Sequence, residues 1–460
     1  MRRWRYPAAI AALFAVSVVL VNPYVRGDGN GYFAWLASAV VDHDLDFGNQ
    51  YRHADPLFRQ AYLDEAGRPI PSALTATGHL KNQWAVGPAV LWAPWFLVAH
   101  AAVRVQGGDP QDGFAPAYRR ACAVGTLFYA LAAMWLSVLV AVRLNLPRSA
   151  AMGAAAAVWG ASSLLVYTYA LPFHVHALAA FTVAWFLWYW LAGGRFERLT
   201  QWAWWGALAG LMGMTYHVDA VFVLVVLAPA LDRWRAGERG RLAAALAIFG
   251  AAGVIASLPQ WIGKLIVYGD PLVTGYQDRF YWLEPKLVLL SLSPDHGVLL
   301  WTPIVGVGAL GFLWVARRRR QLWWLAGACA VFYDVIASYQ NWHGLSSFGN
   351  RFFVSLTLPL VIGVAVVLDA MWRRGAGTRV VAASALLALM AWNVGLAFQW
   401  GTKMLPNRGG VDVEQVAAQQ WQVPRRMLSL VRRYLTDRDA LVSEIERQDQ
   451  QAWDAPKQNR

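Results

Sequence analysis

Residues 380–398 read VVAASALLALMAWNVGLAF and contain no charged side chain. At about 1.5 Å per residue, a helix of this length covers the roughly 30 Å hydrocarbon core of a bilayer. Further long apolar stretches occur at Pro7–Val25 and Ala243–Val267. A chain that repeats such stretches is expected to cross a membrane several times.

The composition supports the same interpretation. The 460 residues are 58% hydrophobic and 15% charged, with a mean hydropathy of +0.35, which is outside the range of ordinary soluble domains. Only helices or closed barrels satisfy their backbone in lipid, and the long apolar runs favour helices. We therefore expect an all-α polytopic membrane protein with about 11–13 transmembrane helices. The expected crossings lie near residues 7–25, 84–103, 120–142, 149–170, 175–192, 202–217, 218–231, 242–268, 298–316, 321–338, 352–371 and 379–399.

The net charge of +13 does not indicate nucleic-acid binding, because the basic residues form short clusters between apolar segments. Clusters at Arg233–Arg241, Arg317–Arg320 and Arg373–Arg374 predict cytoplasmic loops. Two groups conflict with this rule, since Arg104–Arg120 and Arg143–Arg148 are separated by one full apolar segment. Either one of these loops lies outside, or one early segment does not cross completely.

The chain divides into a membrane domain, residues 1–400, and a polar tail, residues 401–460. Within the first, residues 26–83 form an external loop that is too long for a simple connector and is expected to carry interfacial helices. A short amphipathic helix is predicted at Phe33–Val40. In the tail, Arg425–Glu446 predicts a basic amphipathic helix on a membrane surface, on a side that the pattern leaves open.

The first loop opens with RGDGNGY, residues 26–32, which places one carboxylate among three glycines directly after the first crossing. At this boundary Asp28 is suited to act as a general base toward a lipid-linked substrate. The alternative is that Asp28 only caps a helix or belongs to a solvated turn. The acidic run Asp42–Asp46 is interpreted as a solvated turn rather than a cation site, because further oxygen ligands are not recognisable.

Two cations stand at helix ends on the expected external side. Lys81 precedes the re-entry into the membrane and is suited either to a lipid phosphate or to snorkelling at the interface. Arg351 begins an apolar segment on the side where arginine is disfavoured, which favours an anionic partner. The loop between residues 269 and 297 adds Arg279 and Lys286.

These placements resemble the polytopic C-type (GT-C) glycosyltransferases, which include protein mannosyltransferases and the aminoarabinose transferase of lipid A. The likeness covers about the first 400 residues. It consists of the acidic residue shortly before tyrosine at residues 28–32, the proline-marked re-entry at 81–96, and the stretches SPDHGVLLWTP (293–303) and WHGLSSFGNR (342–351). Many members have a second acidic residue where this chain has Gly29.

The resemblance implies an integral membrane enzyme that transfers a sugar, with inversion, from a polyprenyl-phosphate donor to an external acceptor. Asp28 would be the base. The donor phosphate would be held by Lys81, Arg351, Arg279 and Lys286, and the substrates would be contacted by Tyr32, Tyr276, His296 and His343. The implied location is a bacterial inner membrane with the site facing the exterior. Neither a cofactor nor a nucleic-acid partner is expected; a divalent metal is compatible with the loop but has no recognisable ligand set in the sequence.

Two other classes compete with this hypothesis. A lipid or solute transporter would also use about a dozen helices and intramembrane His and Asp residues, although the sequence has no internal repeat. A non-catalytic subunit that binds polyprenyl lipids would use the same cations but would tolerate the loss of Asp28.

Overall fold

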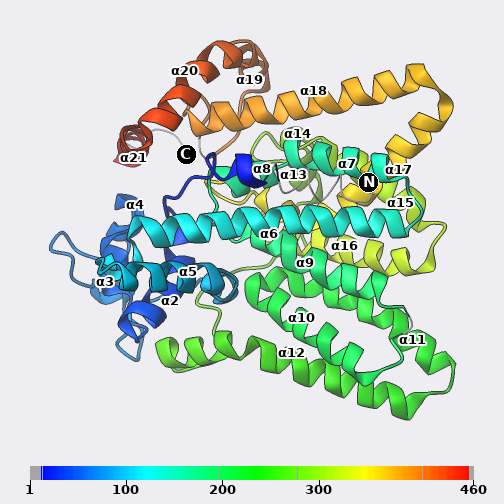
Figure 1. Ribbon diagram of the computed structural model, residues 1–460, viewed down its shortest axis with the longest axis horizontal. Coiled ribbons are helices and arrows are strands. Elements are labelled where there is room, and N and C mark those ends of the chain that lie inside the picture. Colours follow the sequence, from blue (N-terminus) through cyan, green and yellow to red (C-terminus); the bar gives the residue numbers. More distant parts are fainter. Residues whose placement is uncertain (1–11, 13, 195, 277, 407, 455–460) are drawn as a thin grey trace.

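The computed structural model describes residues 12, 14–194, 196–276, 278–406 and 408–454, and in these residues it is helical without any strand beyond isolated bridges (Figure 1). The all-α prediction is therefore confirmed for the described chain. Six helices are long and apolar enough to cross a membrane, as in a multi-pass membrane protein. The expected crossing at residues 7–25 lies partly outside the described residues.

Mostly short connections join the helices of the first loop and of the first half of the bundle. They are α2 (Asp28–Ala37), η2 (Ser38–Asp42), α3 (Gly48–Arg52), α4 (Pro56–Gln60), η3 (Pro71–Ala73), α5 (Gly87–Val105), η4 (Gln111–Gly113), α6 (Pro116–Arg143), α7 (Arg148–Gly160), α8 (Leu164–Tyr169), α9 (His176–Ala192), α10 (Leu199–Thr215), η5 (His217–Val226), α11 (Leu227–Arg235) and α12 (Arg239–Tyr268).

The second half of the chain contains the remaining helices and the tail. They are α13 (Leu287–Leu292), α14 (Val298–Trp301), α15 (Ile304–Ala316), α16 (Arg320–Ser338), η6 (Arg351–Leu356), α17 (Thr357–Arg374), α18 (Ala376–Gly401), α19 (Val413–Gln420), α20 (Val423–Thr436) and α21 (Arg438–Asp454). In the tail, α20 and α21 cover the region where one amphipathic helix was predicted.

Several expected crossings are interrupted rather than continuous. The segment 149–170 is divided between α7 and α8, and 298–316 between α14 and α15. The segments 202–217 and 218–231 form α10, the 3₁₀ stretch η5 and α11. Non-helical backbone at membrane depth is tolerated where protein covers it, and the residues between α7 and α8 are buried.

Small residues allow pairs of helices to pack closely. A Cβ atom on Gly363 of α17 would lie 1.7 Å from the Gly308 carbonyl oxygen of α15, and one on Gly206 of α10 would lie 2.1 Å from the Phe249 carbonyl oxygen of α12. Such backbone contact is typical of helix association in lipid, where hydrophobic exclusion between helices is absent. Few residues of α12 and α18 are buried by other parts of the protein, and these two helices form opposite edges of the bundle (Figure 1).

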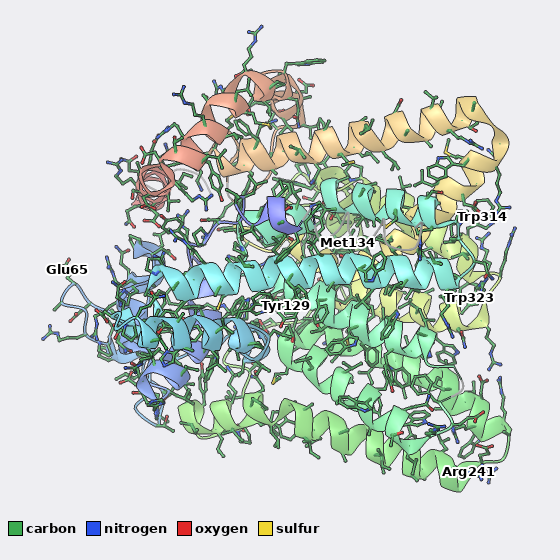
Figure 2. All side chains as sticks on the ribbon, viewed as in Figure 1. Glu65, Tyr129, Met134, Arg241, Trp314 and Trp323 are labelled. Atoms are coloured by element: carbon green, nitrogen blue, oxygen red, sulfur yellow. The ribbon has the colours of Figure 1, made fainter. Side chains whose placement is uncertain are left out.

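The arginine-rich turns are linked to one another at one end of the bundle. Arg319 donates to the Leu144 carbonyl oxygen, Arg143 to that of Leu191, and Arg233 to that of Phe196. Figure 2 shows Arg241, Trp314 and Trp323 at this end and Glu65 of the first loop at the other. The long helices therefore separate a basic end from the end that carries the first loop.

The position of α5 bears on the conflict among the early arginines. The loop after α5 returns to the first loop, where Asp112 contacts His53 at 3.0 Å and accepts a hydrogen bond from Gln50. The C-terminal end of α5 therefore lies with the first loop, while Gly87 at its start packs against Thr215 at the end of α10. α5 does not carry the chain to the basic end (Figure 1). Consequently Arg104–Arg120 lie at the first-loop end and Arg143–Arg148 at the basic end.

The tail also lies at the first-loop end. Tyr434 donates to the Leu20 carbonyl oxygen at 2.9 Å, and Arg438 donates to those of Val19 and Val21. Arg26, which precedes Asp28, lies 3.5 Å from Glu446. This resolves the side of the tail relative to the bundle, which the sequence left open.

We predict that Gly363→Val destabilises the protein, because the new side chain cannot fit between α15 and α17 without displacing backbone. The expected loss is at least about 1–3 kcal/mol, measured as a lower apparent Tm of the purified protein. The matched control is Gly327→Val on α16, where an added Cβ meets nothing within 4 Å. Equal melting of the two variants would contradict close packing of α15 on α17.

Candidate functional site

Asp28 and Arg351 form an ion pair at the first-loop end of the bundle. Arg351 Nη1 donates to Asp28 Oδ2 at 2.6 Å, across 323 positions of sequence. The Asp28 side chain is 35% exposed and that of Arg351 is 17% exposed. The pair is therefore partly shielded from bulk water but not enclosed.

The pKa of Asp28 is set by two opposing effects. Burial on its own would raise the pKa, but the charge of Arg351 and its hydrogen bond hold the pKa of Asp28 below its ordinary value. Asp28 is therefore ionised at neutral pH. It stands in the first turn of α2, where the helix dipole also favours a negative charge.

His174 faces the same carboxylate. Its Nδ1 lies 4.0 Å from Asp28 Oδ2, and this nitrogen has no hydrogen-bond partner in the described chain. Burial lowers the pKa of His174 to about 4, more than the nearby Asp28 charge can offset. The imidazole is therefore neutral at pH 7, and the 4.0 Å contact is not an ion pair.

Aromatic side chains from four elements surround the pair. The rings of Tyr167 and His174 are 5.7 Å apart, and the Tyr167 hydroxyl accepts a hydrogen bond from the backbone N–H of Phe348, close to Arg351. The hydroxyl groups of Tyr32 and Tyr276 contact each other. Besides burial, the charges of Asp28 and Arg351 act on the pKa of both hydroxyls, Asp28 raising it and Arg351 lowering it. Two predicted substrate residues, Tyr32 and Tyr276, thus lie beside the candidate base.

The glycines around Asp28 have a structural reason. Gly27 adopts φ +54°, and a Cβ on Gly29 would lie 2.7 Å from Phe173 Cβ. On Gly31 it would lie 1.8 Å from the Trp84 ring. α2 can therefore press against its neighbours and is buried on nearly all sides, which corrects the predicted amphipathic helix at Phe33–Val40.

The Asp55 side chain stabilises the turn at the start of α2, which carries Asp28. Its Oδ2 accepts hydrogen bonds from the Gly27 backbone N–H at 2.8 Å and from Asn30 Nδ2 at 2.7 Å. Its Oδ1 accepts from the Phe58 N–H at the start of α4. Asp55 was not among the residues predicted from the sequence, although the pair Asp55-Pro56 is a typical helix start.

Three of the predicted phosphate-binding cations lie apart from the Asp28–Arg351 pair. Lys81 is exposed and its Nζ donates to the Ser72 carbonyl oxygen at 2.7 Å. Lys286 lies 3.9 Å from Glu284, and the backbone carbonyl oxygen of exposed Arg279 accepts from the Gln340 N–H. In the described chain, none of the three makes an ion pair or hydrogen bond with Asp28.

A different lysine has a structural role. Lys264 is buried, and its Nζ donates to the carbonyl oxygens of Asn82, Gln83 and Thr274. These bonds tie the segment that leads into α5 to α12 and to the loop that carries Tyr276. The acidic run is also structural, because Asp44 accepts from Ser38 and Asp46 accepts from the Gly48 N–H.

His296 and His343 form a second cluster with Asp295. His296 Nδ1 lies 2.9 Å from Asp295 Oδ1, and His343 Nδ1 lies 3.9 Å from Asp295 Oδ2. The cluster is linked to the first site by the loop that ends at Arg351, since a Cβ on Gly344 would lie 3.4 Å from Arg351 Cγ. Both predicted histidines are therefore near, but not on, the Asp28–Arg351 pair.

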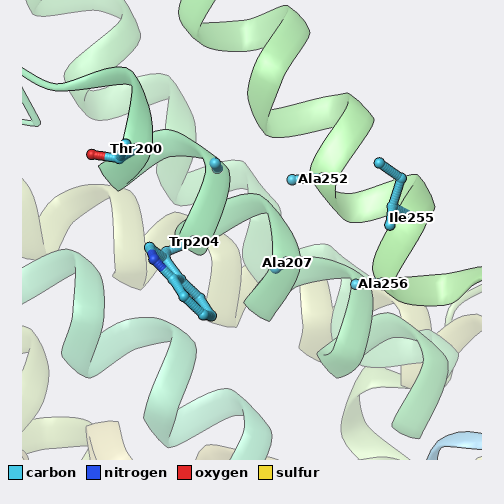
Figure 3. Close-up of a pocket in the computed structure, with 7 residues that line it drawn as sticks. Thr200, Trp204, Ala207, Ala252, Ile255 and Ala256 are labelled. Atoms are coloured by element: carbon cyan, nitrogen blue, oxygen red, sulfur yellow. The ribbon is translucent and has the colours of Figure 1, made fainter.

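A shallow apolar groove occurs elsewhere, between α10 and α12, with a volume of about 330 Å³. Figure 3 shows its lining side chains, among them Thr200, Trp204 and Ile255. None of them belongs to the two polar clusters. The groove is consistent with a lipid-facing surface, and its apolar lining gives it no means of acid–base chemistry.

Comparison with models of known protein families and with curated proteins found no match to this chain.

We predict that His174 makes the protein acid-sensitive. Its native pKa of about 4 lies below the ordinary value of 6.5, so the unfolded chain binds a proton between these pH values that the native chain does not. The free energy of unfolding should therefore fall as pH is lowered from about 6.5 to about 4, by at most about 3 kcal/mol from this group.

The measurement is the apparent Tm of wild type and of His174→Gln, which keeps an N–H donor, at pH 7.5 and 4.5. The variant should lose less between the two pH values than wild type. His79→Gln, at a half-exposed position of the first loop, is the control. A variant that loses as much as wild type would show that His174 is not held neutral.

Proposed function

We propose that the protein is an integral membrane glycosyltransferase that transfers a sugar from a polyprenyl-phosphate donor to an extracytoplasmic acceptor, with inversion. The observation that carries the proposal is the partly shielded Asp28–Arg351 pair at the first-loop end. One side chain accepts a proton and the other binds an anion, and the pair lies beside tyrosines suited to hold a sugar.

In this mechanism the acceptor oxygen or nitrogen attacks the anomeric carbon while the bond from that carbon to the phosphate oxygen breaks. Asp28 takes the proton of the acceptor, and polyprenyl phosphate leaves with the electron pair of the broken bond. The phosphate is already a good leaving group and needs charge stabilisation rather than an acid. Because Asp28 is ionised, it can accept the proton without first losing one.

Arg351 is the group that binds the phosphate in this proposal. Only its Nη1 is engaged with Asp28, and its buried Nε has no hydrogen-bond partner in the described chain. An unsatisfied guanidinium N–H is costly to bury, and a phosphate oxygen would satisfy it. A phosphate bound to Arg351 would weaken the ion pair between Arg351 and Asp28. The pKa of Asp28 would then rise, which would make the carboxylate a stronger base.

Lys81, Arg279 and Lys286 remain proposed donor contacts from exposed positions on neighbouring loops. The orientation follows from the arginine-rich end, which the positive-inside rule assigns to the cytoplasm. The first loop, α5 and the tail then lie on the external side of a bacterial inner membrane. If two helices that share one expected crossing are counted once, the chain crosses about 11–13 times.

We predict that Asp28→Asn abolishes sugar transfer in vesicles supplied with a polyprenyl-phosphate sugar and an acceptor, because the amide cannot take the proton. A loss of about 10²-fold or more is expected. Asp64→Asn is the control, since Asp64 belongs to an exposed ion pair with Arg68 in the same loop. Full activity of Asp28→Asn would remove this mechanism, and lipid or solute movement without transfer would favour a transporter.

A second prediction concerns Arg351. Arg351→Ala should lower both stability and donor use, because it leaves the Asp28 carboxylate without its partner. Arg351→Lys keeps the charge but loses the forked donors, so it should raise the KM for the lipid donor while the apparent Tm changes little. Wild-type donor kinetics in Arg351→Lys would argue against phosphate binding by this residue.

A further inference from the structure

The loop that precedes α14 and the loop that leads into η6 bring three ligand-type side chains together. Asp295 and His296 come from the first loop and His343 from the second, and one donor atom of each lies within 4.8 Å of the others. Among the described residues, this is the group of His, Cys, Asp and Glu side chains with spacing suited to a metal ion.

The hydrogen bonds of His296 leave one place for a cation. Its side chain is fully buried, and its Nε2 lies 2.8 Å from the Ser347 carbonyl oxygen, which can only accept. Nε2 therefore carries the hydrogen. Nδ1 then presents its lone pair to Asp295 Oδ1 at 2.9 Å, and two lone pairs at this distance require a shared cation, either a second proton or a metal ion.

His343 lies beside the same position, with its Nδ1 at 3.9 Å from Asp295 Oδ2. Its Nδ1 accepts a long hydrogen bond of 3.2 Å from the Leu345 N–H, which identifies this nitrogen as the unprotonated one. The side chain is 25% exposed and lies in a loop. Because the lone pair of Nδ1 is now directed at the Leu345 N–H, a metal would replace this contact and the ring would turn toward Asp295.

The surrounding structure holds His296 in the orientation that a ligand needs. Its ring stacks on Trp301 with centroids 4.8 Å apart, and Trp301 Nε1 donates to the Pro294 carbonyl oxygen. His296 also adopts φ +61°, a left-handed conformation that is unfavourable for this residue type. The bond from Nε2 to a backbone carbonyl is the usual means of fixing a metal-binding histidine.

From this the geometry points to a divalent metal site formed by Asp295, His296 and His343, of the class that binds Zn²⁺. Two imidazoles and one carboxylate suit late first-row metals, whereas Ca²⁺ and Mg²⁺ require mostly oxygen ligands. Three protein ligands leave a fourth position for water or an anionic oxygen. The side that faces Arg351 is the natural place for an anion. The site does not depend on the proposed transferase activity.

The test uses the full chain in nanodiscs, stripped of metal with EDTA. Co²⁺ is added while the visible d–d absorption is recorded, and Zn²⁺ is then titrated in competition with a chromophoric chelator. Wild type should bind one equivalent, and His343→Ala should bind at least ~10-fold more weakly. His343 is chosen because its loop position tolerates truncation better than the buried His296.

His79→Ala, which removes a first-loop histidine hydrogen-bonded to Thr77, is the control and should bind as wild type does. Zn²⁺ should also raise the apparent Tm of wild type and of this control, but not that of His343→Ala. Absence of a stoichiometric site in wild type, or equal affinity in wild type and His343→Ala, would overturn the proposal and leave a proton between His296 and Asp295. Neither readout uses sugar transfer, so this outcome is independent of the proposed function.

Discussion

A polypeptide in hydrocarbon has to satisfy its own backbone hydrogen bonds, and the rest of this structure depends on that constraint. It explains why the described chain is helical and why the helices approach through glycine, as at Gly363 and Gly308. It also explains where the exceptions lie. The breaks between α7 and α8 and after α10 are covered by other parts of the protein. The helix ends at these breaks carry buried side chains such as Tyr167 and Tyr216.

The polar chemistry gathers at the end where the first loop, α5 and the tail meet. There the ion pair between Asp28 and Arg351 offsets the cost of burying each charge. A different part of the fold positions each of the two side chains. Asp28 is placed by glycines that allow α2 to press on Phe173 and Trp84, and by the hydrogen bonds of Asp55. Arg351 ends a loop whose other side chains include His343. One loop therefore contributes side chains to both clusters.

Burial and charge pairing together decide the protonation states in this region. An isolated carboxyl group at the Asp28 position would be pushed toward its neutral form, and the adjacent guanidinium reverses that tendency. His174 has no comparable partner and stays neutral. A carboxylate, a guanidinium and a neutral imidazole thus lie within a few ångströms, and their protonation states follow from which of them are paired.

The sequence by itself determined the membrane class and the helical architecture, and it singled out residues 26–32, Asp28 and Arg351 as candidates for a site. These follow from local composition, because the cost of burying charge in lipid and the conformational freedom of glycine act residue by residue. Only the tertiary structure decided that Asp28 and Arg351 contact each other, that Lys81 is not in their group, and that α5 stays at one end. It also identified Asp55 and joined Asp295, His296 and His343, because contacts between distant segments depend on how helices pack, which hydropathy does not encode.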